Sequence, residues 1–151
     1  MALLTSADFT DLISAQLLIN LTNDAPAAAP NETVIDKCSA DFWNDDMWPL
    51  LGVRFTKPST VPATGPCKGW LRKGTRYNMY SRRPENLGTS EGEMVRLERA
   101  EVMKLIREAA AGDATVEGLT LLTDDEADAQ GGSFAFYSND VVYTKTTYRG
   151  F

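Results

Sequence analysis

The longest helical pattern of this chain covers residues 90–112, SEGEMVRLERAEVMKLIREAAAG, and it sets the class of fold. Ser90 and Glu93 have the spacing of a capping box, which satisfies the free amides at the start of a helix. Gly112 is suited to the left-handed conformation that ends one. Between them, apolar residues recur every three or four positions and form a predicted buried stripe of Met94, Val95, Val102, Leu105, Ile106 and Ala109. We expect a helix over residues 90–111 that packs by this stripe on other helices.

The first fifty residues contain two further helical patterns. Residues 6–18 form one of them, with capping-box spacing at its start. The other begins after Asn31, whose side chain can accept hydrogen bonds from the first free amides. Pro49 and Gly52 should end this second helix or kink it near Trp48, because proline cannot donate to the helical ladder.

A fourth helix is predicted over residues 66–81, and its two faces differ. At 100° per residue, one side is mostly apolar and holds Cys67, Trp70, Leu71, Gly74 and Tyr77. Another side is a basic stripe of Lys68, Arg72, Arg76, Arg82 and Arg83. Gly74 costs a helix about 1 kcal/mol relative to alanine, so its place on the apolar side indicates that another helix approaches closely there.

These patterns predict a mainly α fold, a small four-helix bundle with an extended, β-prone C-terminal arm. The bundle should occupy residues 1–118, a linker residues 119–132 and the arm residues 133–151. A chain of 151 residues is long enough for one domain with such an appendage.

Composition excludes several classes of function. The net charge of −6 argues against general nucleic-acid binding, which normally requires a basic excess. The chain has no histidine, the commonest general base and metal ligand, and it carries no cofactor fingerprint. No apolar run approaches the roughly 20 residues that span a bilayer, and the first residues lack the basic segment of a secretory signal. We therefore expect no catalytic residue, cofactor, metal or membrane.

The charged clusters have more than one reading. The acids of the second helix, Asp36, Asp41, Asp45 and Asp46, fit a solvated or salt-bridged face better than paired catalytic carboxylates, since nothing marks one as desolvated. The basic stripe can be a solvated face, can pair with those acids within one subunit, or can meet an acidic partner or phosphate backbone. The run of acids at residues 124–128 lacks calcium-loop spacing and fits a solvated linker.

The two cysteines and three tryptophans are also ambiguous. Cys38 and Cys67 are predicted to be buried thiols, and a disulfide between them is the alternative that the sequence also allows. The tryptophans at 43, 48 and 70 can belong to the core, the default for such residues, or to an interface.

The arm contains many large apolar side chains close to the last residue of the sequence. Its aromatic and β-branched residues are Phe134, Phe136, Tyr137, Val141, Val142, Tyr143, Tyr148 and Phe151. A lone two-stranded hairpin is marginal in water, so the arm either folds back on its own helices or adds to a sheet edge or groove of another chain. Residues 123–132 of the linker could span about 30 Å when extended, more than folding back requires, which favours another chain.

The order of these parts resembles the head–tail adaptor (head-completion or neck connector) proteins of tailed bacteriophages, especially the group of Mu-like long-tailed phages. A T..D helix opens the chain, and LGVRF (51–55) matches the L..R-aromatic segment that follows the second helix. The further motifs are VP (61–62), TRYNMYSRR (75–83), AAAGDATVEGL (109–119) and YRGF (148–151). Together they cover nearly the whole chain.

This resemblance implies a structural virion protein without enzymatic activity. Such adaptors form a ring beneath the portal, usually of twelve copies, extend the DNA channel and provide the docking platform for the next neck protein. The implied partners are the portal protein, neighbouring copies of the chain and the next neck or tail-terminator protein, with DNA only as passing cargo. The implied location is the virion neck, after assembly in the host cytoplasm.

A ring needs two different complementary patches on each subunit. The candidates for such a charge patch between subunits are Lys68, Arg72, Arg76, Asp41, Asp45 and Asp46. The arm is the candidate contact with the portal or the neighbouring subunit. The alternative function is a small cytosolic helical interaction module or assembly chaperone, and a small enzyme is disfavoured by the missing histidine and nucleophile setting.

Overall fold

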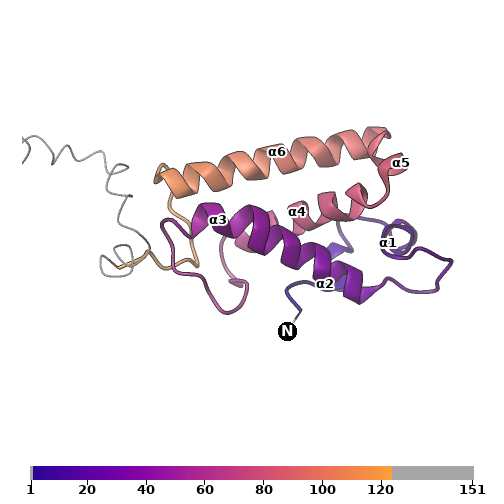
Figure 1. Ribbon diagram of the computed structural model, residues 1–151, viewed down its shortest axis with the longest axis horizontal. Coiled ribbons are helices and arrows are strands. Elements are labelled where there is room, and N and C mark those ends of the chain that lie inside the picture. The colour runs from indigo at the N-terminus through magenta and orange to yellow at the C-terminus, as the bar shows by residue number, and fades with distance from the viewer. Residues whose placement is uncertain (1, 124–151) are drawn as a thin grey trace, which may run out of the picture.

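In the computed structural model, residues 2–123 are described, and they form a helical bundle (Figure 1). This confirms the predicted mainly α fold. The predicted arm, residues 133–151, lies outside the described residues. The helices in chain order are η1 (Ser6–Phe9), α1 (Ala15–Thr22), α2 (Glu32–Asp41), η2 (Phe42–Met47), α3 (Trp48–Leu51), α4 (Cys67–Ser81), α5 (Pro84–Leu87) and α6 (Ser90–Ala111).

Helix α4 is the centre of the bundle. It packs most extensively on α6 on one side and on α2 on the other. Figure 1 shows α6 running along one edge of the body, the continuous α2–α3 segment below it, and α1 end-on. The side chains that close this core are completely buried: Phe9, Leu21, Ile35, Phe42, Met47, Leu71, Met79 and Ile106.

Helix α6 has the predicted length, but its N-cap lies one residue earlier than expected. Thr89 is in the extended conformation, and its hydroxyl accepts a hydrogen bond from the Gly92 amide at 3.1 Å. The prediction of a Ser90–Glu93 capping box was therefore wrong. Gly112 ends the helix at φ 95°, the left-handed region, as predicted.

The buried stripe of α6 is narrower than predicted. Val95, Val102, Ile106 and Ala109 are buried, whereas Met94 is 58 % exposed and Leu105 39 %. Met94 and Leu105 each precede a buried residue by one position, so each lies about 100° around the helix from it. Assigning these two residues to the core was wrong.

The first predicted helix, over residues 6–18, is two separate pieces. The 3₁₀ turn η1 ends at Phe9, and α1 begins only at Ala15. Ser14 separates them because its backbone is extended and its hydroxyl accepts a hydrogen bond from the Leu17 amide at 3.3 Å. An N-capping serine thus starts a new helix inside what the apolar spacing predicted as one helix.

The second predicted helix begins as expected and continues past Pro49. The Asn31 side chain accepts a hydrogen bond from the Thr33 amide at 3.1 Å. The π-helix η2 follows, with the Trp48 amide bonded to the Trp43 carbonyl five residues back. This wider turn directly precedes Pro49, which lacks an amide hydrogen, and the chain stays helical to Leu51 with Gly52 as the C-cap.

Helix α4 confirms the predicted range and the predicted close approach at Gly74. A Cβ atom added at this position would lie 2.3 Å from the Phe42 ring. The short helix α5, begun by Pro84, was not predicted, and it turns the chain from α4 into α6.

Residues 120–122, which the sequence assigned to the linker, return to the body. The Thr56 amide donates to the Thr120 carbonyl at 2.9 Å, and the Leu122 amide to the Arg54 carbonyl at 2.9 Å. These bonds form an isolated antiparallel bridge between Phe55 and Leu121. The chain after α6 is thereby tied beside the LGVRF segment.

Both cysteines are free and buried, as predicted. Trp43 and Trp70 belong to the core, the default expectation. Trp48 is half-buried and stacks on Trp43, with ring centroids 5.5 Å apart.

We expect Gly74→Ala to lower the free energy of unfolding by about 2 kcal/mol, because the new methyl group overlaps the buried Phe42 ring. The matched control is Gly69→Ala on the same helix, where nothing lies within 4 Å of the added Cβ. This control should stabilise the protein by up to about 1 kcal/mol through helix propensity. Urea unfolding followed by circular dichroism measures both, and equal effects of the two changes would contradict the close contact.

Candidate functional site

The basic stripe of α4 is paired within the chain at its N-terminal end. The Lys68 ammonium lies 2.8 Å from the Asp8 carboxylate. Arg72 donates to the Asp8 carbonyl at 2.6 Å and also contacts the Asp11 carboxylate. Both cations therefore hold the η1 segment against α4.

Arg76, the third basic residue of the predicted patch, lies inside the bundle. It is 6 % exposed, and its guanidinium contacts Glu91 at 2.9 Å and Glu98 at 3.1 Å. The Tyr80 hydroxyl donates to the same Glu91 carboxylate at 2.6 Å. This network joins α4 to α6, so Arg76 acts between helices of one chain in this structure.

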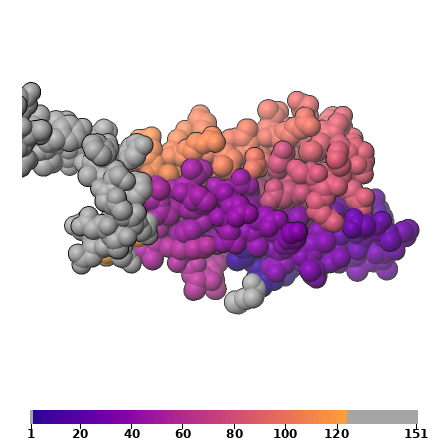
Figure 2. All heavy atoms as spheres, in the orientation of Figure 1, coloured from indigo at the N-terminus to yellow at the C-terminus, as the bar shows by residue number. Residues whose placement is uncertain are grey.

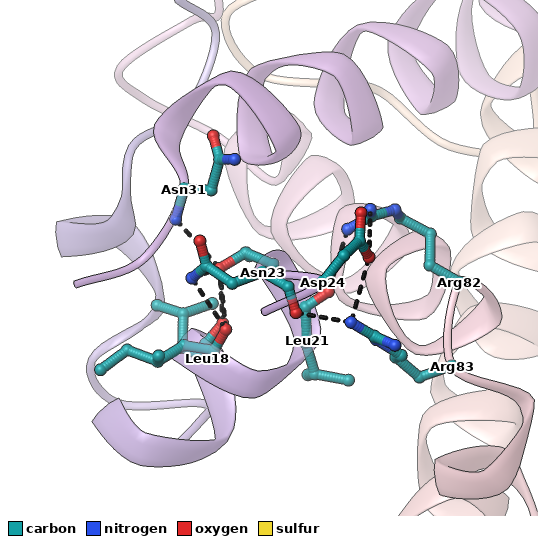
Figure 3. Close-up of polar contacts among 9 residues, drawn as sticks. Leu18, Leu21, Asn23, Asp24, Asn31, Arg82 and Arg83 are labelled. Carbon is teal, nitrogen blue, oxygen red and sulfur yellow. Dashed lines mark hydrogen bonds and ion pairs between the residues drawn. The ribbon is translucent and has the colours of Figure 1, made fainter. Parts of the chain in front are cut away.

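The C-terminal end of the stripe holds the loop after α1 (Figure 3). Arg82 and Arg83 both point at the Asp24 carboxylate, at 3.4 and 3.0 Å. They also donate to the carbonyls of Leu21 and Asn23, at 3.1 and 2.5 Å. Cations beside the carbonyls at a helix C-terminus are favourable, which accounts for this end of the stripe.

The interpretation that the basic stripe pairs with the acids of the second helix is therefore wrong. The acids that pair with it come from η1, from the residues beside α1, and from α6. Sequence reasoning missed this because these partners are distant along the chain and lie outside any regular spacing.

Three of the four acids of the second helix line a groove, whereas Asp36 accepts a hydrogen bond from the Leu3 amide at 3.3 Å. Asp41, Asp45 and Asp46 border a cavity of about 600 Å³ between the α2–η2 segment and the last turn of α4. The other lining residues are Val34, Lys37, Cys38, Asn78, Ser81 and Arg82. Figure 2 shows the α2–α3 segment in purple, on the same face as α6.

Asp46 differs from its two neighbours. Its carboxylate lies 2.9 Å from the Arg99 guanidinium of α6, which also stacks 4.6 Å from the centroid of the Tyr77 ring. Asp41 and Asp45 are exposed, and neither side-chain carboxylate makes a hydrogen bond or ion pair with any part of residues 2–123. Two carboxylates of the groove are thus free to meet a cation from outside the bundle.

The LGVRF segment, which the sequence singled out only by resemblance, has a structural role. The Arg54 guanidinium donates to the Ala109 carbonyl at 3.4 Å, at the end of α6. Leu51 and Phe55 are buried, and Phe55 also pairs with Leu121. The segment therefore closes the C-terminus of α6 and holds the returning chain.

The described residues show no metal-binding group and no activated cysteine. Across residues 2–123, no group of three His, Cys, Asp or Glu side chains is placed to hold a metal ion. Burial raises the pKa of the Cys38 thiol and raises that of Cys67 to about 11, which keeps both thiols protonated and weakly nucleophilic at neutral pH. Nor is any helix in this part of the chain both long and apolar enough to cross a bilayer.

Comparisons with protein-family models, with curated proteins and with solved structures find no match to this chain. The resemblance to phage head–tail adaptors accordingly rests on the order and spacing of its own motifs.

We expect Arg76→Met to lower the free energy of unfolding by about 3 kcal/mol, because it leaves two carboxylates between α4 and α6 without their cation. The matched control is Arg72→Met, one turn earlier, whose Asp11 partner is 66 % exposed. It should cost about 1 kcal/mol. Thermal or urea unfolding of both variants measures the difference, and an equal loss would show that Arg76 is no more important than a surface pair.

Stability should also fall at high pH through Tyr80. Burial, and next the hydrogen bond to the Glu91 carboxylate, raise the pKa of Tyr80 to about 12 from an ordinary value of 10.0. Between these values the unfolded chain loses the proton first, so the free energy of unfolding decreases as pH rises, by up to about 3 kcal/mol. Below pH 10 this contribution is fully present.

The measurement compares urea unfolding of the native protein and of Tyr80→Phe from pH 9 to 12. The variant should be less stable at pH 9, having lost the bond to Glu91, and it should show a shallower decline above pH 10 than the native protein. Parallel curves for the two proteins would contradict the assignment to Tyr80.

Proposed function

We propose that this chain is a structural protein of a tailed-phage virion, a head–tail adaptor that assembles as a ring beneath the portal. The ring extends the DNA channel and provides the docking platform for the next neck or tail-terminator protein. Its partners are the portal, neighbouring copies of the chain, and DNA only as passing cargo.

One observation carries this proposal: the helical body has a core of its own, and an aromatic stretch follows it. The buried apolar cluster is drawn from residues between Leu4 and Val116. Residues 120–122 are tied to the LGVRF segment, and residues 133–151 add eight large apolar side chains beyond that point. A body with its own core followed by such a stretch fits a subunit joined to its neighbours by its arm.

The charges of the body support the same assignment. Asp41, Asp45 and Asp46 lie on the groove at the surface, whereas the cations of the basic stripe pair within the chain. A net charge of −6 suits a channel through which DNA must slide without binding. In a ring, each subunit makes one of many weak contacts with the portal. Once one contact has formed, the others form at a high effective concentration, so the ring binds more tightly than a single subunit.

The test uses phage particles assembled in cells that carry altered copies of this chain. Deleting residues 133–151 should leave the helical body folded, with unchanged far-UV circular dichroism per helical residue, and should abolish its attachment to heads. Electron microscopy should show heads without a ring at the neck and without tails.

Two sets of substitutions distinguish the loss of aromatic side chains from any other change in the arm. Replacing Phe134, Tyr137 and Tyr143 by serine should reproduce the deletion, whereas replacing Thr144, Thr146 and Thr147 by serine should leave attachment intact. Normal particles from the deletion variant would contradict the role of the arm. Particles of native protein without this chain at the neck would contradict the proposed function itself.

A further inference from the structure

The groove between α2–η2 and α4 combines an apolar floor with an acidic rim. Val34 and Cys38 contribute the apolar surface, and Asn78 from α4 closes the floor by donating to the Cys38 carbonyl at 3.1 Å. Asp41 and Asp45 stand on the rim, one helical turn apart. A cavity of about 600 Å³ is large enough for a few side chains of an extended segment.

The charge that this groove offers to a ligand is negative. Of its cations, Arg82 is engaged by the Leu21 carbonyl and by Asp24, which leaves Lys37. Of its acids, Asp46 is engaged by Arg99, which leaves Asp41 and Asp45. A fitting occupant therefore carries positive charge beside apolar or aromatic groups.

Residues 141–151, VVYTKTTYRGF, have this chemistry. They contain Lys145 and Arg149 and no acid, in a chain whose net charge is −6. Their aromatic residues, Tyr143, Tyr148 and Phe151, alternate with these cations. From Thr123, the last described residue, eighteen residues lead to Val141, and they can span up to about 60 Å.

We propose that the groove binds residues 141–151 of a neighbouring copy of this chain. Lys145 and Arg149 pair with the Asp41 and Asp45 carboxylates, and the aromatic side chains cover Val34 and Cys38. The contact is head-to-tail, because groove and segment are different surfaces, and repeated contacts of this kind generate a ring. The inference rests on the proposed function, which supplies the neighbouring copy.

Disulfide trapping between two different chains tests this directly. One chain carries Ser81→Cys on the groove wall, and a second, tagged chain carries Thr147→Cys between the two cations. Both chains also carry Cys38→Ser, because this native thiol borders the groove. Mixing and mild oxidation should give a covalent heterodimer, and each single-cysteine variant mixed with the Cys38→Ser chain alone should give none, since Cys67 is buried. A control chain with Glu101→Cys, exposed on α6, should trap at least tenfold less.

Charge reversal then tests the chemistry of the pairing. Asp41→Lys with Asp45→Lys on the groove chain should lower the heterodimer yield at least tenfold, and Lys145→Glu with Arg149→Glu on the other chain should restore most of it. Glu101→Lys with Glu117→Lys changes the net charge equally at exposed positions away from the groove and should leave the yield unchanged. The variants at Asp41 and Asp45 should melt as the native protein does, since neither carboxylate has a hydrogen-bond or ion-pair partner among residues 2–123.

Several outcomes would overturn the proposal. They are a yield unaffected by reversing Asp41 and Asp45, a loss that the opposite reversal does not restore, or a larger yield with Glu101→Cys. A chain carrying both cysteines that closes only on itself at micromolar concentration would show that the segment folds back.

The same chains separate this inference from the proposed function. If particles have the neck ring but the heterodimer does not form, the groove assignment fails and the adaptor function stands. If the heterodimer forms but the chain is missing from particle necks, the groove assignment stands and the adaptor function fails.

Discussion

The contact between the Phe42 ring and Gly74 is the constraint on which the rest of the bundle depends. Phe42 is completely buried, and the missing side chain at Gly74 gives its ring a place that any Cβ would fill. It brings the junction of α2 and η2 against the middle of α4, the helix that touches most of the others. A glycine in mid-helix costs about 1 kcal/mol, so its presence there makes sense only as the condition for this approach.

The packing of α6 on α4 adds buried polar contacts to the apolar ones. Arg76 follows Gly74 by two positions and faces α6, where Glu91 and Glu98 share its guanidinium. Burying a cation is costly, and a buried pair is weak evidence of net stability, but it is specific: only one register of α6 places both carboxylates beside it. Arg99 and Asp46 add a second such link, from α6 to η2. Apolar burial thus drives the helices together, and these pairs select how α6 lies.

Helix ranges, caps and close contacts could be predicted from the sequence, whereas ion pairs between residues distant along the chain could not. The range of α4, the ends of α6, the Asn31 cap and the close approach at Gly74 all follow from signals within a few residues. Ser14 was missed because an N-cap inside an apolar pattern competes with the periodicity that predicts one helix. The partners of the basic stripe were missed because Asp8, Asp24 and Glu91 lie 15 to 64 residues away and only the fold brings them close.

The core contact also determines where the unpaired acids stand. Phe42 faces α4, so Asp41, its neighbour, is turned about 100° away from the interior, and Asp45 follows one turn later. Asn78, one turn beyond Gly74, binds the Cys38 carbonyl and closes the groove beneath them. The rim charge is therefore not an independent surface feature but a consequence of how α2 docks on α4. Binding of a partner segment to Asp41 and Asp45 would therefore depend on the packing of Phe42 on Gly74. A subunit with a misplaced α2 would bind such a segment less well.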